Sequence, residues 1–183
     1  MTALPSLGFV EAIKLASSRI LDFKGRSRRS ELWWWMLVVI VVGYAISLFS
    51  PNLMVSAIIS IIYMFFGLSV TARRLHDSGK SALWVYISYA LGCVNQIVSA
   101  TSPTVNKLVE ELSSGKVNQH AIEKIIEKGA GDMLLYSVIS VFTGIFAIIV
   151  IIMCLLDSKP ETNNYGDSPK YVDTLQSSRA EIA

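Results

Sequence analysis

The chain has 183 residues, of which 52% are hydrophobic and only 16% carry a charged side chain. A soluble globular domain has about 25% charged residues because most of its surface faces water. The deficit excludes an ordinary soluble domain and is typical of a membrane protein, since a charge placed in hydrocarbon is energetically costly. The formal net charge of +2 is small, so the positions of the charges are more informative than their sum.

Four apolar segments are long enough to cross a bilayer, and none of them contains Asp, Glu, Lys or Arg. A membrane-spanning helix needs about 20 such residues, whereas a soluble core helix of this length would show one polar face. The predicted spans are residues 32–50, 53–72, 82–100 and 133–156. We therefore predict an all-α integral membrane protein with four transmembrane helices.

Lysine and arginine are divided unequally between the two sides of this four-span arrangement. Residues 1–31, the loop after the second span and the tail 157–183 hold twelve of the sixteen, and the segment 101–132 holds four lysines beside five acids. The positive-inside rule then places both termini in the cytoplasm. Residues 1–31 contain no short apolar stretch with a cleavage site, so we predict no removable signal peptide.

Residues 1–31 combine an amphipathic segment with a basic motif. Ser6 is a candidate helix cap, and apolar residues follow it at spacings of four and three, which is one face of a helix. These residues are Phe9, Ile13, Ala16, Ile20 and Phe23. Such a helix lies either in the membrane interface, with its apolar side among acyl chains, or packed on the protein's own cytoplasmic surface. The sequence does not distinguish the two.

The basic motif stands directly before three consecutive tryptophans. Arginines at this position lie at the level of anionic headgroups, and indole rings favour the interface because they are apolar with one polar N–H. The predicted interfacial anchors are Trp33, Trp34, Trp35, Lys80 and Trp84. Glu31 does not fit this pattern, because a carboxylate beside anionic lipid needs a cationic partner. The candidates are Arg28, one turn earlier, and the arginines that follow the second span.

The loop between the second and third spans carries the sequence RRLHDSGKS, from Arg73 to Ser81. His76 beside Asp77 could carry a proton, but one histidine and one aspartate are too few ligands for a structural metal site. The alternative is structural: Asp77 accepts a hydrogen bond from a nearby arginine, or it caps the turn that ends at Gly79.

The tail begins with DSKPETNNYGDSPKY, residues 157–171. Pro160 and Pro169 exclude a continuous helix, and Asn, Gly and Asp residues between them favour turns. This concentration of shape-determining residues predicts that Tyr165 folds back toward the membrane surface. From Tyr171 onward the polar sequence predicts a mobile end.

Three motifs in order carry a family resemblance. The first comprises Phe23, Gly25, Arg26, Arg29, Glu31 and Trp33; the second comprises Arg73, Arg74, Leu75, His76, Asp77, Gly79, Lys80 and Ser81; the third comprises Asn163 or Asn164, Tyr165, Gly166 and Pro169. Over about residues 20–170 the chain resembles the bacterial inner-membrane family known as domain of unknown function 805, the YhaH-like proteins. The resemblance implies a small multi-pass protein of the bacterial cytoplasmic (inner) membrane, and it implies no activity.

The chain departs from the family pattern at two places. Ala82 and Leu83 precede Trp84, where the family usually has glycine and then tryptophan. Residues 101–132 replace a short connection, and they begin with Ser102-Pro103, a favourable helix start. Two helical stretches separated by Ser113–Gly115 predict a helical hairpin on the extracytoplasmic face. It covers the ends of the spans or docks a periplasmic partner.

The three motifs should meet at one membrane depth, because repelling arginines gathered without acids would be unstable. The candidate residues of this cytoplasmic-face network are Arg26, Arg29, Glu31, Arg73, Arg74, His76, Asp77, Tyr165 and Asp167. We predict that Glu31 and Asp77 each pair with an arginine, at least one of them from a different motif.

The sequence contains no nucleotide-binding loop, nucleophile motif or zinc signature, so we expect no catalysis, cofactor, metal or nucleic acid. We expect an accessory or scaffold protein that binds anionic lipid or a protein partner through a basic cytoplasmic face. The possible protein partners are a membrane protein or, at the hairpin, a periplasmic protein. A small oligomeric transporter or channel is the alternative, weighed against the charge-free spans. An intramembrane enzyme that uses His76 and Asp77 is the third possibility.

Overall fold

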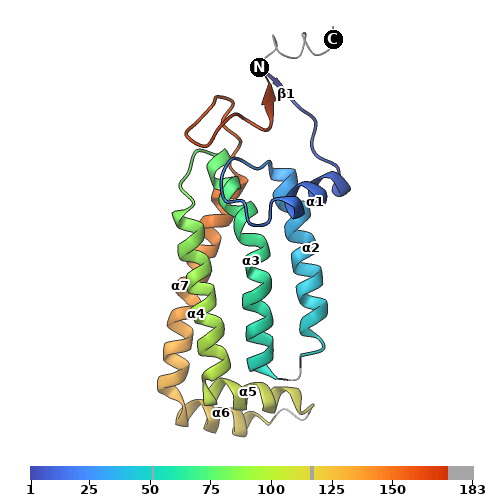
Figure 1. The fold of residues 1–183 in the computed structure, drawn as a ribbon. Helices are drawn as coiled ribbons and strands as arrows, with labels where there is room; N and C mark the ends of the chain where they lie inside the picture. The colour runs from blue at the N-terminus through green and yellow to red at the C-terminus, as the bar shows by residue number, and fades with distance from the viewer. Residues whose placement is uncertain (51, 116–117, 173–183) are drawn as a thin grey trace.

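A computed structural model describes residues 1–50, 52–115 and 118–172, and these residues are mostly helical (Figure 1). In chain order the elements are β1 (Thr2–Ala3), α1 (Phe9–Ser18), α2 (Arg29–Ser47), α3 (Leu53–Asp77), α4 (Leu83–Thr101), α5 (Pro103–Ser113), α6 (Gln119–Lys128), α7 (Ala130–Leu155) and β2 (Tyr171–Val172). Helices α2, α3, α4 and α7 are each long and apolar enough to cross a membrane. The structure thus confirms an all-α fold with four candidate spans, and the protein is a membrane protein.

The four long helices pack side by side in the order α2, α3, α4, α7 (Figure 1). Helices α2 and α4 begin, and α3 and α7 end, at the same end of this bundle, which we call the arginine end. Helices α5 and α6 lie across the opposite end, which we call the hairpin end. Beyond the arginine end, β1 pairs antiparallel with β2.

Helix α3 extends past the predicted end of the second span at residue 72 and continues to Asp77. No residue between 73 and 77 interrupts a helix, and the break comes only at Gly79, whose φ of 74° favours glycine. The side chains expected in a loop therefore stand on the last turns of a helix. This matters for the site because a helix fixes their spacing.

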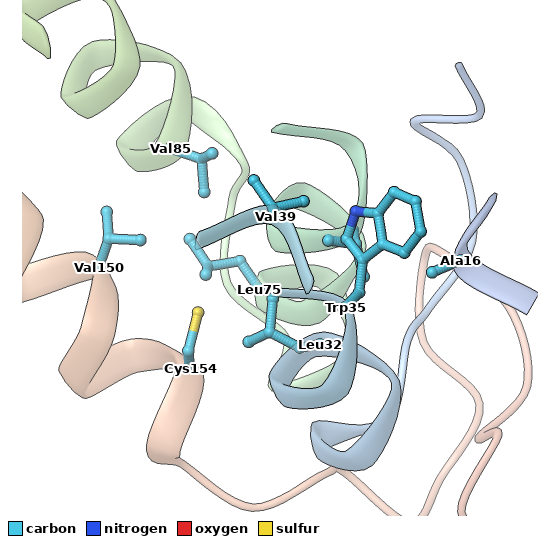
Figure 2. Close-up of a cluster of buried hydrophobic side chains, with 9 residues drawn as sticks. Ala16, Leu32, Trp35, Val39, Leu75, Val85, Val150 and Cys154 are labelled. Atoms are coloured by element: carbon cyan, nitrogen blue, oxygen red, sulfur yellow. The ribbon is translucent and has the colours of Figure 1, made fainter. Parts of the chain in front are cut away.

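Apolar side chains from α1, α2, α3, α4 and α7 form a core near the arginine end (Figure 2). The nine buried members are Ala16, Leu32, Trp35, Val39, Val70, Leu75, Val85, Val150 and Cys154. Trp35 differs from the expectation of an interfacial anchor: its side chain is buried, and its Nε1–H donates to the carbonyl of Phe66 at 2.7 Å. Trp33 and Trp34 remain 42% and 38% exposed, as anchors should.

Helix α1 lies across the end of α2 and packs on it through the buried Ala12 and Ala16 (Figure 1). Its cap is Gly8 rather than Ser6, and the Gly8 N–H donates to Glu11 Oε2 at 3.3 Å. Packing on the protein's own surface is therefore one of its roles. Val10 stays 74% exposed, so the rest of the helix surface carries apolar side chains as well as the exposed Glu11 and Lys14.

The segment 101–132 forms the predicted pair of helices, α5 and α6. Ser102 caps α5 by accepting from the Val105 N–H at 3.3 Å, and Asn118 caps α6. Helix α5 packs against α4 and α7, and Thr104 Oγ1 donates to Asp132 Oδ2 at 3.0 Å. This is the packing of a cover over the helix ends.

The different environments of Trp35 and Trp33 predict different responses to the same substitution. Trp35→Phe removes a hydrogen bond inside the protein and should lower the free energy of unfolding by about 1 kcal/mol. Trp33→Phe, the matched control on the same helix, should change it much less. Thermal unfolding in detergent measures both, and equal losses would contradict the assignment of Trp35 to the core.

Candidate functional site

Five ionised side chains are buried together at the arginine end. Arg26, Arg73 and Arg74 are 0–4% exposed, and Glu31 and Asp77 are 1% and 0% exposed. They come from the loop before α2, from the first turn of α2 and from the last turns of α3. The hydroxyls of Ser27 and Ser158 bond to these five side chains. We call the five side chains and the two hydroxyls the arginine network.

Asp77 is the point at which three segments meet. Its Oδ1 accepts from Nε of Arg26 at 2.9 Å. Its Oδ2 accepts from Nη1 of Arg74 and from the hydroxyl of Ser158. One carboxylate therefore links the loop before α2, the helix α3 and the tail after α7. Charge-assisted bonds of this kind are roughly twice as strong as neutral ones.

Arg26 uses all five of its N–H groups. A guanidinium has five donors and no acceptor, so each donor must find an oxygen when the group is buried. Besides Oδ1 of Asp77, the acceptors are the carbonyls of Asp77 at 3.3 Å, Lys159, Glu161 at 2.9 Å and Gly166 at 3.2 Å. Three of these carbonyls belong to the tail, so Arg26 holds the tail in a fixed loop.

Arg73 joins the start of α2 to the segment that follows α1. Its Nη2 donates to Oε1 of Glu31 at 3.1 Å, and its Nε donates to the Ser27 hydroxyl at 3.0 Å. Its Nη1 donates to the carbonyls of Arg19, at 2.7 Å, and Asp22. Glu31 and Asp77 each pair with an arginine from another motif, which confirms the predicted cross-motif pairing.

Arg28, the other candidate partner of Glu31, forms no ion pair with it in the part of the chain that the structure describes. Its Nε donates to the carbonyl of Pro169 and its Nη1 to that of Pro5, at 2.9 Å. The side chain therefore points toward the tail and the N-terminal segment. Arg28 is half-buried, in contrast to the arginines of the network.

Arg74 closes the end of α7. Its Nε donates to the carbonyl of Cys154 at 3.0 Å, and its Nη2 donates to that of Leu156. The last carbonyls of a helix have no partner within the helix and carry the negative end of its dipole. The network contains three arginines and two carboxylates, a surplus of one positive charge, and these carbonyls help to balance it.

The third motif docks on the second. The Asn163 side-chain N–H donates to the carbonyl of His76 at 2.9 Å, and the Tyr165 ring stacks on the His76 ring with 3.6 Å between centroids. Nδ1 of His76 lies 3.2 Å from the Gly25 carbonyl. His76 is thus held between the first and third motifs, and Tyr165 folds onto the protein itself.

Besides His76 and Tyr165, two more predicted members, Arg29 and Asp167, lie outside the buried network. Arg29 is exposed and donates to Oδ1 of Asp157 at 2.7 Å, and the same oxygen accepts from Lys170 Nζ at 2.6 Å. The bond from Lys170, with help from Arg29, lowers the pKa of Asp157 to about 2. Asp167 accepts from Thr162 at 2.6 Å and has no arginine partner among the described residues.

The expectation of a mobile end from Tyr171 is wrong for its first two residues. Tyr171 and Val172 pair with Ala3 and Thr2, and the Leu4 N–H donates to the Lys170 carbonyl at 2.8 Å. The rest of that expectation, residues 173–183, falls outside the described residues. Sequence reasoning also missed Ser27, Ser158 and Asp157, because a single serine or aspartate in a polar segment gives no signal of its burial or its partner.

The chemical character of the network is that of a clamp. Within residues 1–50, 52–115 and 118–172, every side-chain nitrogen and oxygen that is completely shielded from solvent has a hydrogen-bond partner. The same part of the chain holds no group of three metal-ligating side chains. The donors and acceptors of the network are therefore engaged with one another and with backbone carbonyls.

The pairing of Glu31 with Arg73 can be tested by a double-mutant cycle. Removing one partner leaves a buried unpaired charge, so Glu31→Gln or Arg73→Gln should each cost about 3–5 kcal/mol of unfolding free energy. The double variant should cost less than the sum by about 1–3 kcal/mol. Arg73→Gln should lower the unfolding free energy more than Glu31→Gln, because it also removes the hydrogen bonds to Ser27 and to the carbonyls of Arg19 and Asp22.

The matched control is a second cycle in which Arg74→Gln takes the place of Arg73→Gln. Arg74 is equally buried but bonds to Asp77 instead of Glu31. Losses from Glu31→Gln and Arg74→Gln should be nearly additive. Thermal unfolding in detergent provides the readout for both cycles. Additive losses in the first cycle would show that the Glu31–Arg73 bond contributes nothing to stability.

Three comparisons with known proteins give one match. No curated protein and no solved structure matches the chain. A family model described as "Protein of unknown function (DUF805)" matches residues 20–167, which include all the side chains of the arginine network. Because the match covers most of the chain, this protein belongs to the DUF805 family.

Proposed function

We propose that the protein is a non-catalytic accessory or scaffold protein of the bacterial inner membrane, with both termini in the cytoplasm. It binds anionic lipid or a protein partner through the basic surface of its arginine end. The observation that carries this proposal is that the charged groups of the network bond to one another and to the protein's own backbone carbonyls. A site whose hydrogen-bond donors are engaged by its own backbone is suited to fixing a conformation rather than to transforming a substrate.

The network gives that shape rigidity. It fixes the loop before α2, the ends of α3 and α7, and the tail to one another through buried charge-assisted bonds. A binding surface made of loops is precise only when a fixed scaffold supports it. The arginine end supplies such a scaffold at the level where the membrane meets water.

The basic groups available to a ligand are not those of the network. Lys14, Lys24, Lys80 and Lys159 are exposed at this end, and each cation near an anionic membrane surface contributes about 1 kcal/mol of attraction. They supply the positive surface that the buried arginines cannot. A small oligomeric transporter or channel is the alternative function, and it would need a polar pathway through the bundle.

The proposed orientation predicts the outcome of reporter fusions. Fusions at Gly79 and after Ala183 should report the cytoplasm, and a fusion at Gly115 should report the periplasm, because twelve of sixteen Lys and Arg residues lie on the terminal side. An enzymatic reporter pair that is active on opposite sides of the membrane gives the measurement. A cytoplasmic signal at Gly115 would remove the basis of the proposal.

The lipid-binding surface predicts a specific loss on charge removal. Lys24→Gln with Lys80→Gln should lower the stabilisation that nanodiscs of phosphatidylglycerol give over nanodiscs of phosphatidylcholine by about 1–2 kcal/mol, more at low salt. The control, Lys107→Gln with Lys124→Gln, makes the same charge change at the hairpin end. Thermal unfolding in each nanodisc gives the stabilisation. An unchanged value in the first variant would leave a protein partner as the ligand.

A further inference from the structure

Helices α2 and α7 flank an apolar groove that runs down one side of the bundle. At the arginine end they are joined, because Arg29 donates to the Leu155 carbonyl at 3.4 Å and to Asp157. Further down, α3 and α4 separate them (Figure 1). Two cavities, of about 190 and 260 Å³, lie between them. Both are lined by Met36, Ala147 and Ser88, so they adjoin.

The groove is open toward the hydrocarbon. Its lining includes the buried side chains of Leu32 and Val150, which belong to the apolar core drawn in Figure 2. Its rim carries Trp33, Ile40 and Ile151, which are 42%, 58% and 50% exposed. An apolar groove that opens into a bilayer is filled by hydrocarbon, because an empty one forfeits dispersion contacts along its whole lining.

One polar group in the groove has no partner. Ser88 is 9% exposed and lines both cavities, yet its hydroxyl bonds to nothing in the part of the chain that the structure describes. Two threonines of the spans show the usual alternative, a bond to the same helix: Thr71 donates to the Gly67 carbonyl at 2.7 Å, and Thr143 to that of Ile139 at 2.8 Å. A hydroxyl left unpaired in hydrocarbon is unfavourable, so Ser88 points to an acceptor supplied by the occupant.

The mouth of the groove is basic. A third cavity, of about 190 Å³, is lined by Arg28, Arg29 and Lys170 together with serines of the N-terminal segment, α2 and the tail. Asp157 offsets one of these three cations, which leaves a surplus of two positive charges. Nη2 of Arg28 has no protein partner among the described residues, and α2 begins here without a side-chain cap. Each of these features favours an anion.

The basic cavity and the apolar groove follow one another along α2, although they share no lining residue. Arg29 stands one helical turn before Leu32 and Trp33, which begin the groove. Ser88 lies about 8 Å along α4 from its first residue, Leu83, and so stays near this end. A cationic mouth, a hydroxyl just below it and an apolar channel beyond follow the order of phosphate, ester and acyl chain in a phospholipid.

We propose that one anionic phospholipid binds in this groove. Its phosphate lies among Arg28, Arg29 and Lys170, an ester carbonyl accepts from Ser88, and an acyl chain follows Met36 and Ala147 between α2 and α7. The proposal deepens the proposed function, on which it rests, by assigning the lipid to one stoichiometric site rather than to the basic surface as a whole.

The test is native mass spectrometry of the full-length protein in detergent, titrated with phosphatidylglycerol or phosphatidylcholine. We expect one phosphatidylglycerol per chain to bind more tightly than phosphatidylcholine. Arg28→Gln with Lys170→Gln should weaken phosphatidylglycerol binding by about tenfold or more and leave phosphatidylcholine nearly unchanged. Ala147→Phe, which fills the groove, should weaken both lipids. Its matched control is Ile148→Phe, at a position 58% exposed on the outer face of α7, and it should weaken neither.

The outcomes separate this site from the broader proposal. Equal losses from Arg28→Gln with Lys170→Gln and from Lys24→Gln with Lys80→Gln, with no effect of Ala147→Phe, would overturn the groove and leave the basic surface intact. If no cation variant changes phosphatidylglycerol binding, both proposals fail in their lipid form. A dimer mass that Ala147→Phe abolishes would also overturn the lipid site, because a second copy of the chain would then occupy the groove.

Discussion

The carboxylate of Asp77, held between the guanidiniums of Arg26 and Arg74, is the interaction on which the arginine end depends. Taking ions out of water costs several kcal/mol each, and this cost is offset only when every charge has its partner and every donor its acceptor. Arg26 meets that condition only with the tail in place, and Arg74 only with the end of α7 in place. The folded position of each segment therefore depends on the others, because the buried ions need partners from all of them.

This dependence changes the meaning of the basic motifs. Arginines beside a membrane span are usually taken as headgroup contacts, yet Arg26, Arg73 and Arg74 are buried and face the protein. The cations that remain for a ligand come from other positions, including Lys24 and Lys80 on the surface. The surface that meets lipid or a partner and the network that supports it are thus made of different residues.

The sequence predicted well what depends on hydrophobicity and on charge balance. Charge-free segments predicted the four spans, and the need of Glu31 for a cation predicted its bond to an arginine, with Arg28 and the arginines after the second span as the candidates. It did not predict the burial of Trp35, because a tryptophan next to the interface satisfies the aromatic-belt pattern whichever way it points. Nor did it predict the backbone acceptors of Arg26 and Arg73. A carbonyl is present at every residue, so its availability depends on the tertiary fold alone.

The bond from Arg74 to the end of α7 has a consequence for the biogenesis of the protein. The chain is made from its N-terminus, so Arg26 and Arg74 emerge long before the carbonyls of Cys154, Leu156 and Lys159 that they bond to. Until the last helix has been inserted and the tail has folded back, Arg26 and Arg74 can pair with Asp77 but lack these backbone acceptors. Completion of the network thus coincides with completion of the chain, and an intermediate that lacks the last helix is left with unsatisfied donors on both arginines.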